Sequence, residues 1–206
     1  GRLSAVHCVH MSEADLDLMQ ERGVVAVHNP KSNMKLGSGI APVCAMLARG
    51  IPVALANDGS ASNDLLDMFE EMRAAALLQK VAAEDPSAIA AADVFRMATE
   101  NGARACRIDA GTIDPGRLAD LAVVNLRKPH LVPVHDVINS LVYCARADDV
   151  ETTIINGQVV MRDRRLLTMD EEGILDQAQE CGASLRQKSL RSELCPKAMN
   201  GGGPAG

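Results

Sequence analysis

The sequence predicts an α/β protein in which helices cover a parallel sheet. Three apolar runs follow one another in the first part of the chain, and each run is followed by a loop and a helical pattern. The runs are almost continuously apolar, which is typical of parallel strands buried on both faces. Farther along, the dipeptide Asn156-Gly157 separates two β-branched runs and predicts an antiparallel hairpin. The predicted class is therefore α/β with an added antiparallel layer.

Each of the first three units has the order strand, loop, helix, and capping residues set its limits. Ser12 and Asp15 form a Ser-x-x-Asp helix start, and Gly23 and Gly50 end the first and second helices. The Gly-rich run Lys35–Gly39 predicts a loop before the second helix. The predicted strands are 3–9, 24–27 and 52–56, and the predicted helices are 12–22, 41–49 and 64–80.

The pattern changes after residue 93. A helix is predicted from Asp93 through Ala103, and a turn-rich segment then leads into an apolar strand at 121–126. The hairpin around Asn156-Gly157 pairs 150–155 with 158–161, because both turn residues tolerate positive φ. A last helix is predicted over residues 170–191. In the Gly-rich end of the chain, apolar residues do not recur at a spacing that would let them pack against the rest of the protein.

Composition and charge exclude several classes of function. The chain has 206 residues, 21 Lys+Arg against 27 Asp+Glu, one Tyr, two Phe and no Trp. This balance gives neither the basic surface nor the aromatic platforms that nucleic-acid binding needs. No apolar stretch approaches the ~20 residues that cross a bilayer, and no signal-type start is present. The six cysteines form no Cys-x-x-Cys pair, which predicts reduced thiols and a cytoplasmic location.

Three polar residues fall at or near the carboxyl ends of predicted parallel strands, where ligands meet such sheets: His7, His28 and Asp58. Asp58 is placed to bind a cation or to act as a general base, although an Asp before Gly59 is also a common turn residue. His7 and His10 are a weak metal pair, because strand side chains at i and i+3 point to opposite faces. Taken singly, His7 and His28 are more commonly core histidines than catalysts.

Other short motifs give weaker evidence for a binding or catalytic site. The loop Lys35–Gly39 lacks the Lys-Ser/Thr of a phosphate-binding P-loop, and no Gly-x-Ser-x-Gly supports a serine hydrolase. The charged run Glu70-Glu71 with Arg73 predicts a solvated face of the third helix.

Four segments together resemble the amidohydrolase superfamily: HCVHMSEADLDLM, HNPKSNMKLGSGIAPV, NDGSASNDLLDMFEEMRAAALLQK and GTIDPGRLADLAVV. The resemblance is greatest to the methylthioadenosine/S-adenosylhomocysteine deaminases and the triazine chlorohydrolases, and it covers residues 1 to 168. It implies a metal-dependent (β/α)₈ TIM barrel, of which this chain supplies strands 6 to 8 and the C-terminal portion of a small β-sandwich. The parts it implies are a partial barrel at 1–111 and sandwich strands at 112–168. The residue pattern beyond them predicts a C-terminal helix at 169–195 and a disordered tail at 196–206.

The resemblance also assigns two site residues. Asp58 in Asn-Asp-Gly matches the eighth-strand Asp that binds a divalent ion, usually zinc, and accepts a proton from the attacking water. His7 matches the sixth-strand His that helps to move protons. The family's His-x-His and its fifth-strand His followed three residues later by Glu are absent, so three of four metal ligands are not present. Asn57 stands where the family usually has Thr.

These departures predict that the chain is the C-terminal part of a longer enzyme, as a truncated gene model or a degenerate copy, since a closed barrel needs ~250 residues. The expected parent uses one divalent metal ion, which the resemblance implies is zinc, to deaminate an adenine-type ring. Alternatives are a chlorohydrolase or deaminase of a triazine or other heterocycle and, in another class, a non-catalytic remnant. The isolated chain is expected to be inactive. A small heterocyclic substrate is the expected partner, a homo-oligomer is left open, and the substrate-binding residues are unknown.

Overall fold

The structure is a computed structural model that describes residues 3–193. Two compact units divide the chain, residues 1–165 and residues 166–206, and each is described by itself. The predicted tail at 196–206 and Cys195 lie outside the described residues.

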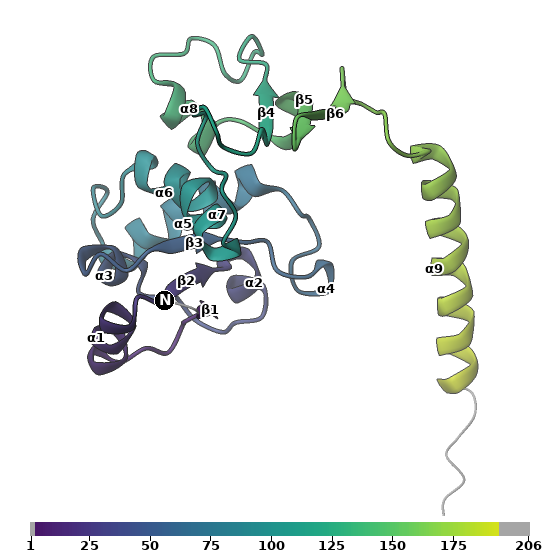
Figure 1. Cartoon of the computed structure of the whole chain (residues 1–206). Helices are drawn as coiled ribbons and strands as arrows, with labels where there is room; N and C mark the ends of the chain where they lie inside the picture. Colours follow the sequence, from purple (N-terminus) through teal and green to yellow (C-terminus); the bar gives the residue numbers. More distant parts are fainter. Residues whose placement is uncertain (1–2, 194–206) are drawn as a thin grey trace, which may run out of the picture. The chain divides into compact units, whose positions relative to one another are not determined.

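A three-stranded parallel sheet is the centre of the first unit (Figure 1). Its strands lie in the order β1 (Ser4–Val6), β2 (Val25–His28) and β3 (Val53–Leu55), and both neighbouring pairs are parallel. All three predicted strands are confirmed. β1 is shorter than the predicted run because His7 and Cys8 turn into the left-handed region and end it.

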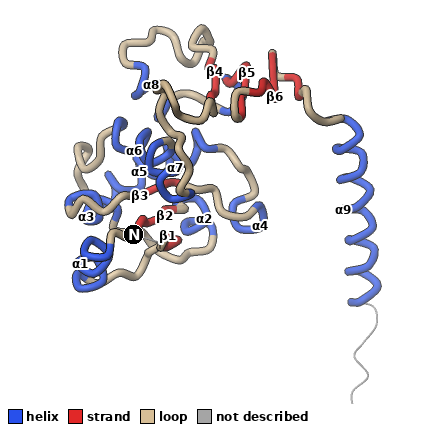
Figure 2. Tube along the Cα trace, viewed as in Figure 1, coloured by secondary structure: helices blue, strands red, loops and turns tan. Residues whose placement is uncertain are grey.

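Helices follow each parallel strand, as Figure 2 shows by its alternation of blue and red segments. After β1 comes α1 (Glu13–Arg22), and after β2 come α2 (Pro30–Lys35) and α3 (Val43–Ala48). After β3 come α4 (Ser60–Asn63), α5 (Met68–Ala83), α6 (Ala91–Ala98) and α7 (Glu100–Cys106). Farther along the chain, between the strands of a second sheet, lie α8 (Val137–Tyr143) and the 3₁₀ helix η1 (Ala147–Asp149). The predicted limits of α1 are confirmed in detail: Ser12 forms a capping box with Asp15, and Gly23 ends the helix in the left-handed conformation.

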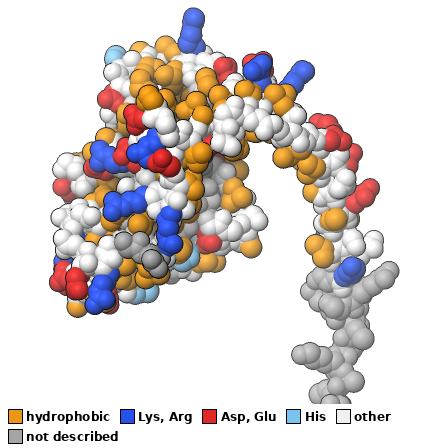
Figure 3. All heavy atoms as spheres, in the orientation of Figure 1, with side chains coloured by type: hydrophobic (Ala, Val, Ile, Leu, Met, Phe, Trp, Pro, Cys, Tyr) orange, Lys and Arg blue, Asp and Glu red, His pale blue; other side chains and the backbone are white. Residues whose placement is uncertain are grey.

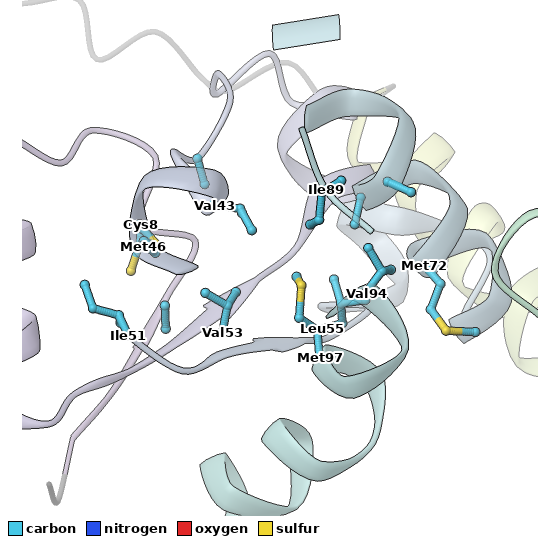
Figure 4. Close-up of a cluster of buried hydrophobic side chains, with 14 of the residues drawn as sticks. Cys8, Val43, Met46, Ile51, Val53, Leu55, Met72, Ile89, Val94 and Met97 are labelled. Atoms are coloured by element: carbon cyan, nitrogen blue, oxygen red, sulfur yellow. The ribbon is translucent and has the colours of Figure 1, made fainter. Parts of the chain in front are cut away.

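The two faces of the parallel sheet differ in how they are packed. The register partners Ala26 and Val53 belong to the hydrophobic core, in which strand side chains meet those of α3, α5 and α6 (Figure 4). Side chains alternate between faces along a strand, so the register partners Val6 and Val27 lie on the opposite face. Val6 is 54% exposed. This second face is therefore covered only in part, because Val25 and Ala54 on it are buried while Val6 is exposed. The sheet does not close into a barrel within the described residues.

The helices depart from the prediction in several places: α4 and α8 lie where no helix is predicted, and the regions of α2, α5 and α6 differ as follows. α2 lies just before the predicted loop Lys35–Gly39, where no helix is predicted, and Pro30 at its start is a favoured first helical residue. The helix predicted from Asp64 starts at Met68, because Asp67 caps the amides of the next turn and Asp64 has positive φ. The helix predicted over 93–103 is two helices, α6 and α7, which separate at Thr99 (φ −120°, ψ −91°).

The antiparallel layer is confirmed. Its strands are β4 (Leu121–Val124), β5 (Val150–Ile155), β6 (Gln158–Arg162) and the short β7 (Arg165–Leu166), in that order across one sheet. Asn156 (φ 49°) and Gly157 (φ 79°) form the predicted turn between β5 and β6. The assignment of this sheet to a β-sandwich stays a prediction, as do the predicted domain limits.

The prediction of a solvated charged face on α5 is wrong for Glu71 and Arg73. Glu71 is 0% exposed, and its carboxylate accepts hydrogen bonds from Asn63 Nδ2 at 2.5 Å and from the Lys31 amide at 3.4 Å. Arg73 donates to the carbonyl oxygens of Tyr143 and Ala145. These polar partners come from other elements, so helical periodicity along α5 does not show them.

Charges of both signs are interspersed on the face shown in Figure 3. Ion pairs also join different elements, as Arg49 does with Asp17 of α1 and Lys35 of α2 with Asp64. The mixed pattern fits the absence of a basic surface in the sequence.

The second unit contains one described helix, α9 (Glu171–Glu193), whose first turn carries Glu171 and Glu172. This confirms the predicted helix, with its limits shifted by one or two residues. Within the described part of the chain, no helix is both long and apolar enough to span a membrane.

Candidate active site

His7 and Asp58 meet at the carboxyl-end edge of the parallel sheet. His7 directly follows β1, and Asp58 follows β3, so the two residues leave strands that are separated by β2. Their side chains nevertheless approach until His7 Nε2 lies 3.9 Å from Asp58 Oδ2. Both side chains are partly exposed. The sequence placed both residues near strand ends, and the structure brings them together.

Both residues adopt backbone conformations that are uncommon outside glycine. The φ angle is 67° at His7 and 66° at Asp58, and Cys8 also has positive φ. The turn at His7 is held by two hydrogen bonds: the His7 amide donates to Val27 O, and the Cys8 amide donates to Val6 O. Such strained positions concentrate at functional sites, because surrounding structure must hold them in place.

Helix α2 supplies a partner for each of these side chains. Ser32 Oγ donates a hydrogen bond to Asp58 Oδ2 at 2.6 Å, and Asn33 Oδ1 lies 2.9 Å from His7 Nδ1. Ser32 and Asn33 are buried. Sequence reasoning missed both residues, because it predicted no helix between the second strand and the loop Lys35–Gly39. The signal was present in Pro30, since proline after a polar residue favours the first turn of a helix.

Hydrogen bonds keep Asp58 ionised. The Ser32 hydroxyl is the main cause that lowers the pKa of the Asp58 carboxyl, and the Gly59 amide, 2.8 Å from Oδ1, and the Ser62 hydroxyl lower it further. These donors stabilise the charged form. Asp58 is therefore a carboxylate at neutral pH, which can accept a proton or bind a cation.

His28 lies outside this pair. It ends β2 as the register partner of the core residue Leu55, so its side chain is on the covered face of the sheet. It is 2% exposed, and burial, with a smaller contribution from His7, lowers its pKa to about 4. Neither ring nitrogen has a hydrogen-bond partner among the described residues. His28 is thus a buried neutral histidine, and His10 is exposed.

A layer of buried amides supports the loop that carries Asp58. Asn63 Nδ2 donates to the carbonyl oxygen of Asn57 and to Glu71, both at 2.5 Å. Asn29 Nδ2 donates to the Ala56 carbonyl at 3.0 Å. Burial raises the pKa of the Glu71 carboxyl, while its hydrogen bonds oppose that effect. The backbone before Asp58 is therefore fixed by side chains from two other segments.

The described residues do not form a complete zinc site. Zinc in proteins takes three or four His, Cys or carboxylate ligands. No group of three or more such side chains within residues 3–193 is arranged to hold a metal ion. Asp58, with His7 beside it, supplies at most part of a ligand set, so the remaining donors would have to come from residues outside the described range.

The five described cysteines, Cys8, Cys44, Cys106, Cys144 and Cys181, are free thiols. This agrees with the prediction of reduced cysteines for that part of the chain. Burial raises the pKa of Cys8 and Cys44, so neither is a thiolate nucleophile at neutral pH.

The chain is similar in sequence to a known protein family. Residues 1–160 match the model of the amidohydrolase family. The chain is 52% identical over 186 residues to a 5-methylthioadenosine/S-adenosylhomocysteine deaminase of Syntrophobacter fumaroxidans, covering 89% of this chain and 42% of that protein.

Two solved structures are also similar. An adenosine deaminase from Xanthomonas campestris with bound zinc has a TM-score of 0.88 and 40% identity, over 90% of this chain and 43% of that one. A zinc complex of atrazine chlorohydrolase from Arthrobacter aurescens has a TM-score of 0.81 and 30% identity, over 86% of this chain and 40% of that one. The chain thus spans less than half the length of these relatives, and its open sheet corresponds to part of their fold.

Proposed function

The chain belongs to the amidohydrolase family, and from this membership and the His7–Asp58 pair we propose that it forms part of a metal-dependent hydrolase that deaminates an adenine-type ring. The substrate class is that of the methylthioadenosine and S-adenosylhomocysteine deaminases, which the chain resembles over most of its length. In the reaction, water adds to the ring carbon that bears the amino group. The carbon–nitrogen bond then breaks, and ammonia and an oxo ring are formed.

The observation that carries this proposal is the position of an ionised carboxylate 3.9 Å from an imidazole at the open edge of the sheet. Asp58 accepts a proton from the attacking water, since hydrogen bonds keep it charged. His7 exchanges a proton with the reacting group on the side of Nε2. A carboxylate and an imidazole at this separation can together supply the general acid and base that hydrolysis of a carbon–nitrogen bond requires.

We further propose that Asp58 contributes one carboxylate ligand to a single divalent ion, zinc by analogy with the Xanthomonas relative. Such an ion makes water a stronger nucleophile at neutral pH. The family is metal-dependent, but the described residues supply too few donors for the ion alone. The remaining ligands and the substrate-binding residues are therefore proposed to lie in another part of the protein.

A fusion protein tests this function. The N-terminal part of the Syntrophobacter deaminase is joined ahead of residue 1. Ammonia release is measured with methylthioadenosine, S-adenosylhomocysteine and adenosine, and chloride release is measured with atrazine. The fusion is expected to deaminate one or more of the three adenine compounds and to contain about one metal ion, while the 206-residue chain alone is inactive and binds none.

Asp58→Asn in the fusion is the decisive variant. It removes the charged proton acceptor and weakens the metal site, so activity should fall by about 10²–10⁴-fold, with loss of bound metal. The intact Syntrophobacter enzyme is the positive control. A folded fusion without activity, or Asp58→Asn with full activity and full metal content, would contradict the proposal and favour the non-catalytic remnant.

A triazine or related heterocycle is the second candidate substrate class, favoured by the similarity to atrazine chlorohydrolase. Chloride release from atrazine without deamination of the adenine compounds would select this second class.

We also propose that the protein works in the cytoplasm, supported by its free thiols. A homo-oligomer is part of the same proposal, and light scattering tests it by measuring the molar mass of the fusion in solution.

A further inference from the structure

Helix α2 connects two residues that the sheet itself keeps apart. His7 leaves β1 and Asp58 leaves β3, and neither strand pairs with the other. α2 begins two residues after the middle strand β2 ends. Its consecutive residues Ser32 and Asn33 reach one side chain each: Ser32 contacts Asp58, and Asn33 contacts His7.

The contact with Asn33 selects one form of the His7 ring. Asn33 Oδ1 can only accept a hydrogen bond, so at 2.9 Å from it His7 Nδ1 carries the hydrogen. In neutral histidine this leaves the lone pair on Nε2. Nε2 is the ring nitrogen that lies 3.9 Å from Asp58 Oδ2. The amide therefore directs the proton-accepting nitrogen toward the carboxylate.

The contact with Ser32 fixes the carboxylate in turn. Ser32 Oγ donates to Oδ2, the same oxygen that faces His7, and the Gly59 amide donates to Oδ1 at 2.8 Å. Each carboxylate oxygen thus has its own donor. Rotation of the Asp58 side chain would break one of these hydrogen bonds.

Contacts with α5 hold α2 in place. Lys31 Nζ lies 2.6 Å from Glu70 Oε2, and the Lys31 amide donates to the buried Glu71 at 3.4 Å. At the other end of α2, the Ser38 amide donates to the Asn33 carbonyl at 2.9 Å. Ser32 and Asn33 are 0% and 1% exposed. A helix fixed on both sides and buried at these two positions can orient its partners with little freedom.

We propose that Ser32 and Asn33 are positioning residues: Asn33 holds His7 as the Nδ1–H tautomer, and Ser32 holds Asp58 with Oδ2 toward Nε2. The catalytic consequence rests on the proposed function of His7 and Asp58. The tautomer and the hydrogen bonds are properties of the folded chain and can be measured without activity.

The tautomer is tested by NMR on the 206-residue chain labelled with ¹⁵N-histidine, which reports the chemical shifts of the ring nitrogens. The spectra are recorded at a pH above the ordinary pKa of histidine, about 6.5. Wild-type His7 is expected to show a protonated Nδ1 and an unprotonated Nε2. Asn33→Asp keeps an acceptor oxygen and removes the amide donor, so it should keep this tautomer. Asn33→Leu has similar size but no acceptor, so it should lose the preference for Nδ1–H.

The two variants also decide which group of the amide faces His7. An Nε2–H tautomer in the wild type that Asn33→Asp reverses would show that Nδ2 donates to Nδ1, and would overturn the proposal. So would a mixture of tautomers unaffected by either variant. A wild-type chain without a dispersed spectrum would contradict the compact unit on which the contact depends. Asn139→Leu, at an exposed helical position, is the matched control and should leave His7 unchanged.

Kinetics in the fusion test the consequence for the reaction. Asn33→Leu and Ser32→Ala should each lower kcat by about 10–100-fold, as removal of supporting hydrogen bonds does, with a much smaller change in KM. Asn33→Asp should restore most of the lost kcat. Ser38→Ala, on an exposed serine of the following loop, should have no effect.

The outcomes separate the two proposals. An inactive wild-type fusion that still shows the Nδ1–H tautomer of His7, lost in Asn33→Leu, would remove the proposed function and leave the positioning contact intact. An active fusion in which Asn33→Leu and Ser32→Ala retain full kcat would overturn the positioning role and leave the function intact.

Discussion

The parallel and antiparallel sheets bury their strands to different extents. All three residues of β3 are buried, whereas no residue of β5 is fully buried. Neighbouring strands of the parallel sheet are joined through helices, while β5 and β6 are joined by a two-residue turn. The parallel sheet therefore depends on contacts between distant segments, whereas the β5–β6 hairpin of the antiparallel sheet depends on local geometry. This is why the candidate site, built from three separate segments, lies on the parallel sheet.

The largest expected difference between the sheets is in core packing. Leu55→Ala removes a buried β3 side chain from the core, and it should lower the free energy of unfolding by about 2–5 kcal/mol. Ile155→Ala, at the exposed end of β5, should change it by less than about 1 kcal/mol. Urea denaturation of the 206-residue chain measures both. Equal losses would show that the two sheets do not differ in this way.

The next expected difference is in how the free energy of unfolding depends on pH, and it comes from His28 at the end of β2. Its pKa is about 4 in the folded chain and about 6.5 when unfolded. Both states are neutral above pH 6.5, where the full stability is present. As pH falls from about 6.5 to 4, the unfolded chain binds a proton that the folded chain does not, so stability is lost, by roughly 3 kcal/mol.

His28→Leu isolates this effect, because it removes the titrating group and leaves an apolar side chain on the covered face of the sheet. Between about pH 7 and 4.5, the variant should lose less stability than the wild type, although carboxyl groups titrate in both. The measurement is the difference between their pH slopes in urea denaturation. Parallel slopes would mean that His28 is protonated in the folded chain as easily as in the unfolded one.

The smallest difference tests the local geometry of the antiparallel sheet. Gly157 has φ of 79°, and a Cβ there would meet no atom within 4 Å, so Gly157→Ala adds backbone strain without a clash. A loss of about 1 kcal/mol is expected. Gly182→Ala in α9, where φ is not positive and space is also open, is the matched control and should be neutral or stabilising. A neutral Gly157→Ala would show that the turn does not set the register of the hairpin.

Local signals in the sequence were sufficient where the structure depends on neighbouring residues. Ser12 and Gly23 bound α1 as predicted, and Asn156-Gly157 forms the predicted turn. The same reasoning missed α2, although Pro30 is a favoured first residue of a helix. It also placed Glu71 in solvent, since helical periodicity does not show that Asn63 and the Lys31 amide come from other segments to bind it.

The sequence by itself determined the strand–helix units, the hairpin and the presence of His7 and Asp58 near strand ends, because caps, turns and apolar periods act over a few residues. Only the tertiary structure decided that His28 turns to the core and that Ser32 and Asn33 reach Asp58 and His7. Those contacts require three strands in register and a helix fixed above the middle one. Their free energy comes from packing between distant segments, which no short stretch of sequence contains.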